Sequence, residues 1–164
     1  MLRTERPGDM LPVYELVSAA FGRPDEAELV NRLRECGAAV VTMVEEEEYE
    51  FMGHLMLSPI TIEGQEGPWL GLAPVAVHPD WQGQGIGSDL VREGLEMDWK
   101  AVVVLGDPAY YARFGFRPAS DFGLHCIYEV PTECFMAMEL QPGGLDGVRG
   151  EVLYHPLFDE EPVE

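Results

Sequence analysis

The stretch that decides the fold is Val75-Ala-Val-His-Pro-Asp-Trp-Gln-Gly-Gln-Gly-Ile-Gly-Ser88. An apolar strand ends here, the chain turns at Pro79-Asp80, and glycines at 83, 85 and 87 introduce a predicted helix over about residues 85–98. Alternating glycines let the backbone curve so that successive N–H groups point into one concavity. The start of the helix adds unpaired N–H groups and the positive end of its dipole. The stretch therefore predicts an anion site suited to a pyrophosphate.

Two familiar phosphate-binding loops do not fit these residues. A GxGxxG fingerprint starting at Gly83 would need a glycine where Ser88 stands, and one starting at Gly85 would need it where Leu90 stands. The sequence contains no GxxxxGK[ST] motif. The pattern that fits is Gln-x-x-Gly-x-Gly at Gln82, Gly85 and Gly87. The alternative is a tight strand-to-helix connection without a ligand, although three alternating glycines are more than a turn requires.

Around this stretch, hydrophobic periodicity predicts a mixed sheet with helices packed on it. Helices are expected from Asp9 to Phe21, from Asp25 to about Cys36, and near residues 109–114. Strands are expected at residues 38–44, 51–62, 69–78, 101–105, 122–128 and 135–140. Residues 45–49, four glutamates followed by Tyr49, are expected to form a hairpin turn. The chain beyond Gln141 is expected to be irregular.

The net charge of the chain argues against partners that are themselves strongly negative. Thirty acidic residues against ten basic ones give a formal charge of −20, which repels nucleic-acid backbones and anionic membrane surfaces. We therefore expect no nucleic acid and no membrane among the partners. The N-terminus lacks an apolar signal-peptide stretch, so a cytoplasmic protein is expected. The three cysteines, at 36, 126 and 134, have no CxxC spacing and are expected to be buried reduced thiols, and no metal site is expected.

Pro74 predicts a break in the sheet. Proline cannot donate to a ladder and is confined to edges, strand starts and bulges, yet Pro74 lies inside an apolar strand with Gly71 three residues earlier. Sheet pairing is therefore expected to stop near Pro74, beside the glycine-rich stretch. An ordinary bulge without a ligand is the alternative.

Three segments resemble the GCN5-related N-acetyltransferase (GNAT) family. Gln82 to Gly87 is similar to the family's acetyl-CoA loop, Arg/Gln-x-x-Gly-x-Gly/Ala. Tyr110-Tyr-Ala-Arg-Phe-Gly-Phe116 is similar to its Tyr-x-x-x-Gly-Phe element, and Arg3 to Asp9 resembles its opening. The sequence of residues 106–116 is also similar to that of a bacterial subgroup of predicted acetyltransferases whose substrate is uncharacterised. The resemblance covers roughly residues 1–140, which predicts one acetyltransferase domain there and an acidic tail at 141–164.

The resemblance implies an acyl-CoA acyltransferase of α/β (α+β) class, with a mixed, mostly antiparallel sheet whose fourth and fifth strands splay apart. Acetyl-CoA would be the cosubstrate, without a metal, and its acetyl group would pass directly to a primary amine in a ternary complex. Tyr111 would protonate the leaving thiolate, or would only pack against the cofactor. The residues expected at the cofactor are Val75, Ala76, Val77, Gln82, Gly83, Gln84, Gly85, Ile86, Gly87 and Ser88.

The general base and the acceptor are left open by the sequence. The fourth strand offers no carboxylate, and the candidates by nearness to strand ends are His54, Glu63, His78 and Asp107. A base acting through water, or an amine of lower pKa, is equally admissible. The acceptor is expected to be a small-molecule or peptide amine, and homodimerisation is left open. The alternative function is a non-catalytic CoA-binding or sensing module of the same fold.

Overall fold

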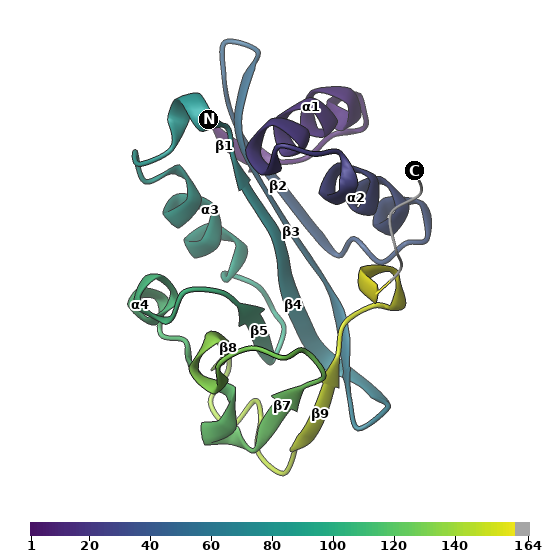
Figure 1. Cartoon of the computed structure of the whole chain (residues 1–164), viewed down its shortest axis with the longest axis vertical. Helices are drawn as coiled ribbons and strands as arrows, with labels where there is room; N and C mark the ends of the chain where they lie inside the picture. The colour runs from purple at the N-terminus through teal and green to yellow at the C-terminus, as the bar shows by residue number, and fades with distance from the viewer. Residues whose placement is uncertain (160–164) are drawn as a thin grey trace. The chain divides into compact units, whose positions relative to one another are not determined.

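The computed structural model describes residues 1–159, which form two compact units. The first unit contains residues 1–58, 73–94 and 157–159, and the second contains residues 59–72 and 95–156. The long strands β3 (Glu50–Ile62) and β4 (Gln65–Val77) each contribute one part to either unit. Figure 1 labels the four α-helices and most of the strands.

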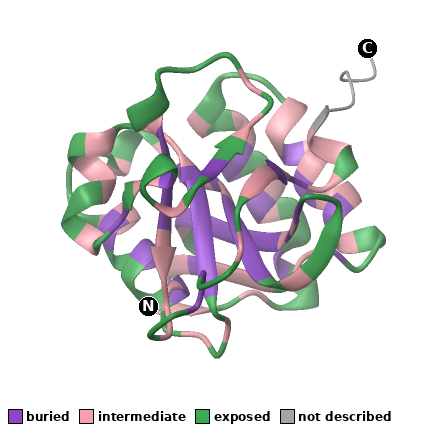
Figure 2. Ribbon diagram, turned by 90° about the horizontal axis from the view of Figure 1, so that it is seen from below, coloured by how far each residue is buried: buried purple, intermediate pink, exposed green. Residues whose placement is uncertain are grey.

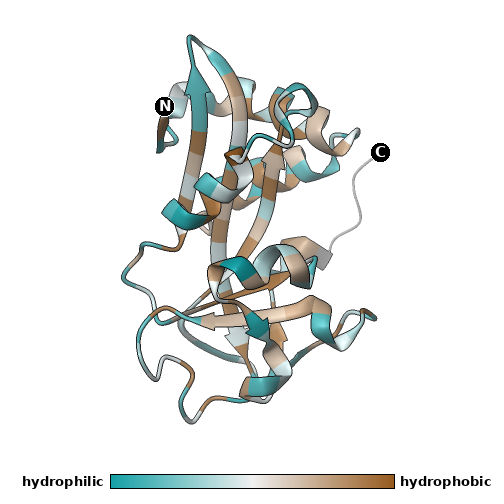
Figure 3. Cartoon of the chain, turned by 90° about the vertical axis from the view of Figure 1, so that its left-hand side faces the viewer, coloured by the Kyte–Doolittle hydropathy of each residue, from teal (hydrophilic) through white to brown (hydrophobic). Residues whose placement is uncertain are grey.

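The first unit is built on an antiparallel sheet covered by two helices. Strands β1 (Leu2–Thr4), β2 (Val41–Glu47) and β3 pair in that order, with a bulge beside Glu45. Helices α1 (Met10–Phe21) and α2 (Asp25–Glu35) lie side by side in Figure 1 and bury their apolar faces on this sheet. Their shared core is Val13, Val17, Ala27, Val30, Leu33, Ala38, Val44, Met56 and Ala76. Figure 3 shows hydrophobic and hydrophilic bands on the helices, as one-sided burial requires.

The other face of β3 carries helix α3 (Ile86–Gly94). Side chains alternate between the faces of a strand, so Gly53, Leu55 and Leu57 point away from Met56 and toward α3. A Cβ atom at Gly53 would lie 2.8 Å from side-chain atoms of both Ile86 and Leu90. The absence of a side chain at Gly53 therefore lets α3 pack directly on the strand.

Ion pairs explain why the acidic run continues as strand. The sequence predicts a turn at residues 45–49, but β2 extends to Glu47 and the turn consists of Glu48 and Tyr49. The N-terminal amine of Met1 pairs with Glu45 at 3.0 Å and with Glu47 at 2.6 Å, and Arg3 lies 3.3 Å from Glu46. Pairing with β1 thus neutralises carboxylates that would otherwise favour a solvated turn.

The second unit pairs strands that are far apart in the sequence. Strand β5 (Ala101–Leu105) runs parallel to Trp69–Gly71 of β4 and antiparallel to β8 (Phe135–Glu139), and β6 (Arg117–Pro118) follows β8. Strand β9 (Gly150–Leu153) joins the end of β3 to β7 (Leu124–Cys126). Figure 2 colours the centre of the strands as buried. The predicted class, a mixed and mostly antiparallel sheet flanked by helices, is confirmed.

Several predicted boundaries are wrong. The chain beyond Gln141 is not irregular throughout, because β9 pairs with two other strands. The helix after the glycines ends at Gly94 instead of residue 98. A Cβ atom added at Gly94 would lie 2.9 Å from the Leu55 side chain, so the last turn of the helix packs closely on β3. The helix near 109–114 is α4 (Pro108–Tyr111) followed by a 3₁₀ turn, Ala112–Phe114. The three cysteines were expected to be buried, but Cys36 is exposed and Cys126 and Cys134 are half-buried.

Within residues 1–159, no helix is both long and apolar enough to cross a membrane. The division into a domain at 1–140 and a tail at 141–164 stays a prediction, and its last residues, 160–164, lie outside the described part of the chain.

Candidate functional site

The glycine-rich stretch of the first unit is held in shape by its own side chains. The side-chain amide nitrogen Nε2 of Gln82 donates a hydrogen bond to the carbonyl oxygen of Val77 at 3.1 Å, which connects the loop to the end of β4. The imidazole of His78 accepts a hydrogen bond from the backbone N–H of Asp80 at 3.1 Å, and the N–H of Trp81 donates to the carbonyl of His78. These hydrogen bonds hold the loop in its shape without a ligand. The side chain of Gln82 is bonded to the protein backbone at Val77.

The backbone between Gln82 and α3 is open. Gly83 and Gly85 adopt φ angles of +79° and +85°, which L-residues with side chains rarely adopt, and a Cβ atom on either would meet nothing within 4 Å. The N–H of Asp89 donates to the carbonyl of Gly85 at 3.0 Å, so the loop continues directly into a nine-residue helix. Curved exposed amides followed by a helix N-terminus form a cradle that fits an anion such as a pyrophosphate.

The second unit contains the predicted break in strand pairing. Pairing of β4 with β5 runs from Trp69 and Ala101 to Gly71 and Val103 and stops there, three residues before Pro74. Strand β5 continues to pair with β8 as far as Leu105. The ladder between β4 and β5 therefore ends at Val103, although β5 itself continues to Leu105.

Tyr111 lies on α4, just after β5. The carboxylate of Asp107 caps this helix by accepting from the N–H of Ala109 at 2.9 Å. A Cβ atom on Gly106 would lie 2.5 Å from the Tyr111 ring, and Phe116 packs edge-on with ring centroids 5.7 Å apart. Burial raises the pKa of the Tyr111 phenol to about 12. The phenol is therefore a protonated O–H donor at neutral pH.

Tyr110, the adjacent tyrosine, has a different environment. Its half-buried ring is covered by the guanidinium of Arg113, 4.7 Å from the centroid, and packs edge-on against Tyr111. The two neighbouring phenols are thus distinguishable by their surroundings.

The four candidate bases all have structural roles. His54 is fully buried in the first unit, with Nε2 3.5 Å from Glu5, and burial lowers its pKa. The Glu63 carboxylate accepts from the N–H of Glu151 at 2.7 Å, at the β3–β4 turn of the second unit. His78 and Asp107 accept the backbone hydrogen bonds described above. These contacts give no support for any of the four as the base.

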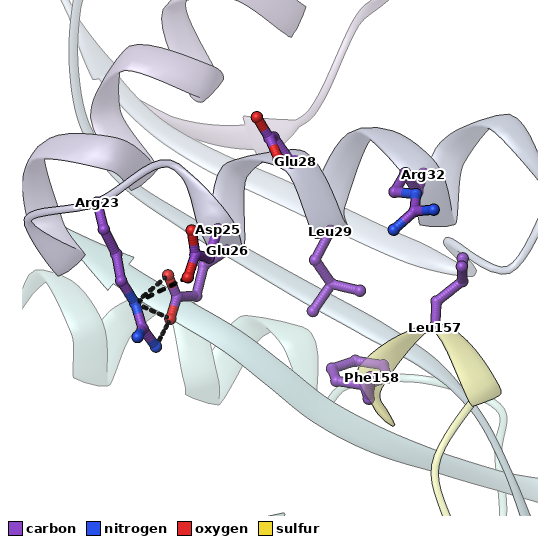
Figure 4. A pocket seen from close by; sticks show the side chains of 8 residues that line it. All are labelled: Arg23, Asp25, Glu26, Glu28, Leu29, Arg32, Leu157 and Phe158. Carbon is purple, nitrogen blue, oxygen red and sulfur yellow. Dashed lines mark hydrogen bonds and ion pairs between the residues drawn. The ribbon is translucent and has the colours of Figure 1, made fainter. Parts of the chain in front are cut away.

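Each unit also contains a cavity. One of about 270 Å³ in the first unit lies between α2 and the C-terminal turn Pro156–Asp159 (Figure 4). Two of its carboxylates lie beside Arg23, which bonds Glu26 at 2.9 Å and lies 3.7 Å from Asp25. Its lining residues are Arg23, Asp25, Glu26, Glu28, Leu29, Arg32, Leu157 and Phe158. The second unit has a cavity of about 560 Å³ beside β3, β4 and β9.

Sequence reasoning missed Tyr154, which follows β9 in the second unit. Its side chain is buried and lies against Gly71, where β4 and β5 stop pairing. Tyr154 belongs to no motif and stands in a segment we expected to be irregular. Because its position depends on pairing between strands far apart in the chain, no local signal could have found it.

Comparisons with known proteins agree on one family. Residues 37–118 match the family model described as acetyltransferase (GNAT) domain. The chain is 37% identical over 164 residues to the uncharacterised N-acetyltransferase YhbS of Escherichia coli, covering 97% of this chain and 98% of YhbS. A crystal structure of Escherichia coli YhbS in complex with CoA matches with a TM-score of 0.92, 37% identity, and coverage of 98% and 92%. A GNAT family acetyltransferase of Brucella melitensis in complex with acetyl-CoA matches with a TM-score of 0.82, 36% identity and 97% coverage of each chain.

Proposed function

The chain belongs to the GNAT acetyltransferase family, and we propose that it transfers the acetyl group of acetyl-CoA to a primary amine by direct attack in a ternary complex. The observation that carries this proposal is the open glycine cradle at Gly83 and Gly85 that leads into α3. Relatives at 36–37% identity were crystallised with acetyl-CoA and CoA, which supports the same cosubstrate here. The match to an uncharacterised N-acetyltransferase also agrees with the subgroup suggested by residues 106–116.

The cosubstrate would be held mainly by backbone. In this proposal the amides from Gln82 to Ser88 and the N-terminus of α3 bind the pyrophosphate. The pantetheine arm pairs with Val75, Ala76 and Val77 in the manner of an added strand. Backbone amides suit this acidic chain, because distant carboxylates are screened beyond about 8 Å at physiological salt.

The proposed reaction needs one donor for the oxyanion and one for the leaving sulfur. The amine nitrogen bonds the acetyl carbon, the carbonyl oxygen gains negative charge, and a backbone N–H such as that of Val75 stabilises it. The carbonyl then re-forms as the C–S bond breaks, and the thiolate takes the proton of the Tyr111 phenol. The nitrogen, positively charged after its attack, releases one N–H proton to water, and the Tyr111 phenolate regains a proton from water. The raised pKa of Tyr111 keeps that proton in place at neutral pH.

The acceptor must lose a proton before it attacks. A lysine-like amine has a pKa of about 10.4, so its neutral form costs about 4.6 kcal/mol at pH 7. A carboxylate beside the amine would raise that cost by stabilising the ammonium. The proposal therefore uses water as the proton acceptor, with an acceptor that is a small-molecule or peptide amine. A cytoplasmic location and a homodimer are compatible with it and stay predictions.

A screen of amines tests the proposal. The protein is incubated with acetyl-CoA and a panel of arylalkylamines, diamines, polyamines and lysine peptides, and thiol release is followed. At least one amine should raise thiol release well above the rate with acetyl-CoA alone. Binding of acetyl-CoA with no amine-dependent release across the panel would favour the alternative, a CoA-binding module without catalysis.

A further inference from the structure

The ring of Tyr111 lies against the backbone of Gly106, within the second unit. A Cβ atom on Gly106 would lie 2.5 Å from Cε2 of this ring, 3.1 Å from Cδ2, and 3.5 Å from Cζ, the atom that carries the hydroxyl. Carbon atoms in ordinary contact are about 3.5–4.0 Å apart. The ring would therefore have to move by about 1 Å to admit a side chain at position 106.

Both sides of this contact are held in place. The N–H of Gly106 donates to the carbonyl oxygen of Cys134 at 3.0 Å, which connects the glycine to the residue before β8. Around the tyrosine ring, the centroids of Tyr110, Phe114 and Phe116 lie 5.0, 6.2 and 5.7 Å away, which is the range of aromatic packing. A bulkier residue at position 106 would therefore push the ring out of its place among these aromatic neighbours.

Asp107 fixes the start of α4, the helix that carries Tyr111. Its carboxylate oxygen Oδ1 accepts from the N–H of Ala109 at 2.9 Å. Its carbonyl oxygen accepts from the N–H groups of Tyr110 and Tyr111 at 3.1 and 3.0 Å. Pro108 takes the first helical position, where its fixed φ angle favours the turn. Because α4 spans four residues, the bonds of this first turn set the direction of the whole helix.

We propose that Gly106 and Asp107 are positioning residues for acetyl transfer, and that together they set where the Tyr111 hydroxyl lies relative to the leaving sulfur. The inference rests on the proposed function, in which that hydroxyl protonates the thiolate. Proton transfer needs the two heavy atoms within about 2.6–3.2 Å of each other, and a misplacement of about 1 Å can lower a rate by about 10²-fold. One methyl group at position 106 produces a displacement of this size.

This role distinguishes Asp107 from a general base. A base loses its function when its carboxylate becomes an amide, because an amide oxygen accepts hydrogen bonds but does not take up a proton at neutral pH. A helix cap keeps its function, since asparagine caps helices about as well as aspartate does. The carboxylate of Asp107 already accepts the N–H of Ala109, which is the capping role.

The first test is a double-mutant cycle in the full chain, with thiol release followed for the best amine of the screen. Gly106→Ala should lower kcat about 10²-fold and leave the affinity for acetyl-CoA unchanged. In the Tyr111→Phe variant, no hydroxyl remains to be misplaced, so adding Gly106→Ala should lower kcat by no more than a further factor of about two. A purely structural effect would be the same in both backgrounds, so equal reductions overturn the inference.

Gly67→Ala is the matched control. A Cβ atom on Gly67 would also lie 2.5 Å from an aromatic ring, that of Trp69, and both glycines belong to the second unit. Gly67→Ala and Gly106→Ala should each lower the midpoint of a urea melt, but Gly67→Ala should keep kcat within about twofold of wild type. An equal loss of kcat in Gly67→Ala would attribute the effect to general destabilisation and would overturn the inference.

Asp107 supplies a second test that does not depend on the folding of Gly106→Ala. Asp107→Ala should lower kcat about fivefold, which corresponds to the free energy of one helix cap. Asp107→Asn, the conservative variant, should restore kcat to within about twofold of wild type. Equal losses in the two variants would give the carboxylate a role in proton transfer and would overturn the positioning role of Asp107.

A ¹⁹F signal reports the placement of the Tyr111 ring without any reaction. 3-Fluorotyrosine is placed at position 111, and the signal is recorded for the full chain without ligand. Gly106→Ala should shift this signal, and Gly67→Ala should leave it in place. An unmoved signal in Gly106→Ala overturns the inference. A shifted signal, together with no amine-dependent thiol release in wild type, overturns the proposed function instead, and the placement of the ring by Gly106 stands.

Discussion

Replacing Tyr111 with phenylalanine removes one hydroxyl and keeps the ring that packs on Gly106 and Phe116. The free energy of unfolding should therefore change by less than about 1 kcal/mol, since no cavity is created. The rate should change far more. General acid catalysis contributes about 10²–10⁴-fold to the rate, so kcat and kcat/KM should fall together by that factor. The fall corresponds to a loss of about 3–5 kcal/mol of transition-state stabilisation.

The pKa of Tyr111 adds a second signature. At pH 10 an ordinary phenol is about half ionised, whereas one with a pKa of about 12 is only about 1% ionised. Any alkaline loss of wild-type activity due to this residue should therefore appear near pH 12 and be missing from the pH profile near pH 10.

Steady-state thiol release, measured with the best amine from the screen, provides the assay. Tyr110→Phe is the matched control, because it makes the same chemical change one residue earlier, beneath Arg113. Its kcat should stay within about twofold of wild type. If Tyr111→Phe also stays within that range, Tyr111 is a packing residue and the acid assignment is refuted. If the affinity for acetyl-CoA falls instead of kcat, the phenol belongs to cofactor binding.

Two further predictions concern the first unit. Gly53→Ala should lower the free energy of unfolding by about 1–3 kcal/mol, because the new Cβ would lie 2.8 Å from the side chains of Ile86 and Leu90. Gly8→Ala is the control for the same denaturant melts and should be neutral, because a Cβ there meets nothing within 4 Å. Equal melting curves for the two variants would contradict the packing argument. The free energy of unfolding should also decrease as the pH is lowered below about 6.5. Burial lowers the pKa of His54 in the folded protein, so the unfolded chain takes up a proton on this histidine at a higher pH than the folded chain does. Although burial raises the pKa of Glu5, its bonds to His54 and Arg34 leave it lowered, so a further loss is expected below about 4.5. One titrating group changes the free energy of unfolding by at most about 1.4 kcal/mol per pH unit. In urea melts at a series of pH values, His54→Leu should reduce the fall in the free energy of unfolding that begins below about pH 6.5. An unchanged slope would refute the assignment of that fall to His54.

The local parts of the site were predictable because each depends on a residue type with a specific backbone property. Gly83 and Gly85 have positive φ angles, and such positions favour glycine strongly enough to be read from sequence. Strand β5 at 101–105 was predicted with its observed limits, since Ala-Val-Val-Val-Leu is apolar on both faces. The resemblance through Gln82 and Tyr111 added the family, and the match to YhbS extends over 97% of the chain, beyond the 140 residues we expected.

The missed features depend on partners far away in the sequence. Glu45 to Glu47 lie in a strand because Met1 and Arg3 neutralise them, and this pairing leaves no trace in the acidic run itself. The apolar periodicity through Leu95 predicts a longer helix, but α3 ends at Gly94, where a Cβ atom would lie 2.9 Å from the Leu55 side chain of β3. Strand β9 and Tyr154 are positioned only through β3, β7 and Gly71. Sequence patterns record local preference, and these outcomes come from tertiary packing.

The measurement that tests the central claim most directly is an acetyl-CoA titration of the thermal melt. At a ligand concentration a hundredfold above Kd, binding adds about 2.7 kcal/mol of stability, which for a chain of this size raises Tm by about 5–10 °C. Gly85→Val should abolish the shift, and Gly64→Val should retain it, because both glycines have positive φ and open surroundings but only Gly85 lies in the cradle. No shift of wild-type Tm at millimolar acetyl-CoA, or an equal shift in Gly85→Val, would contradict the account.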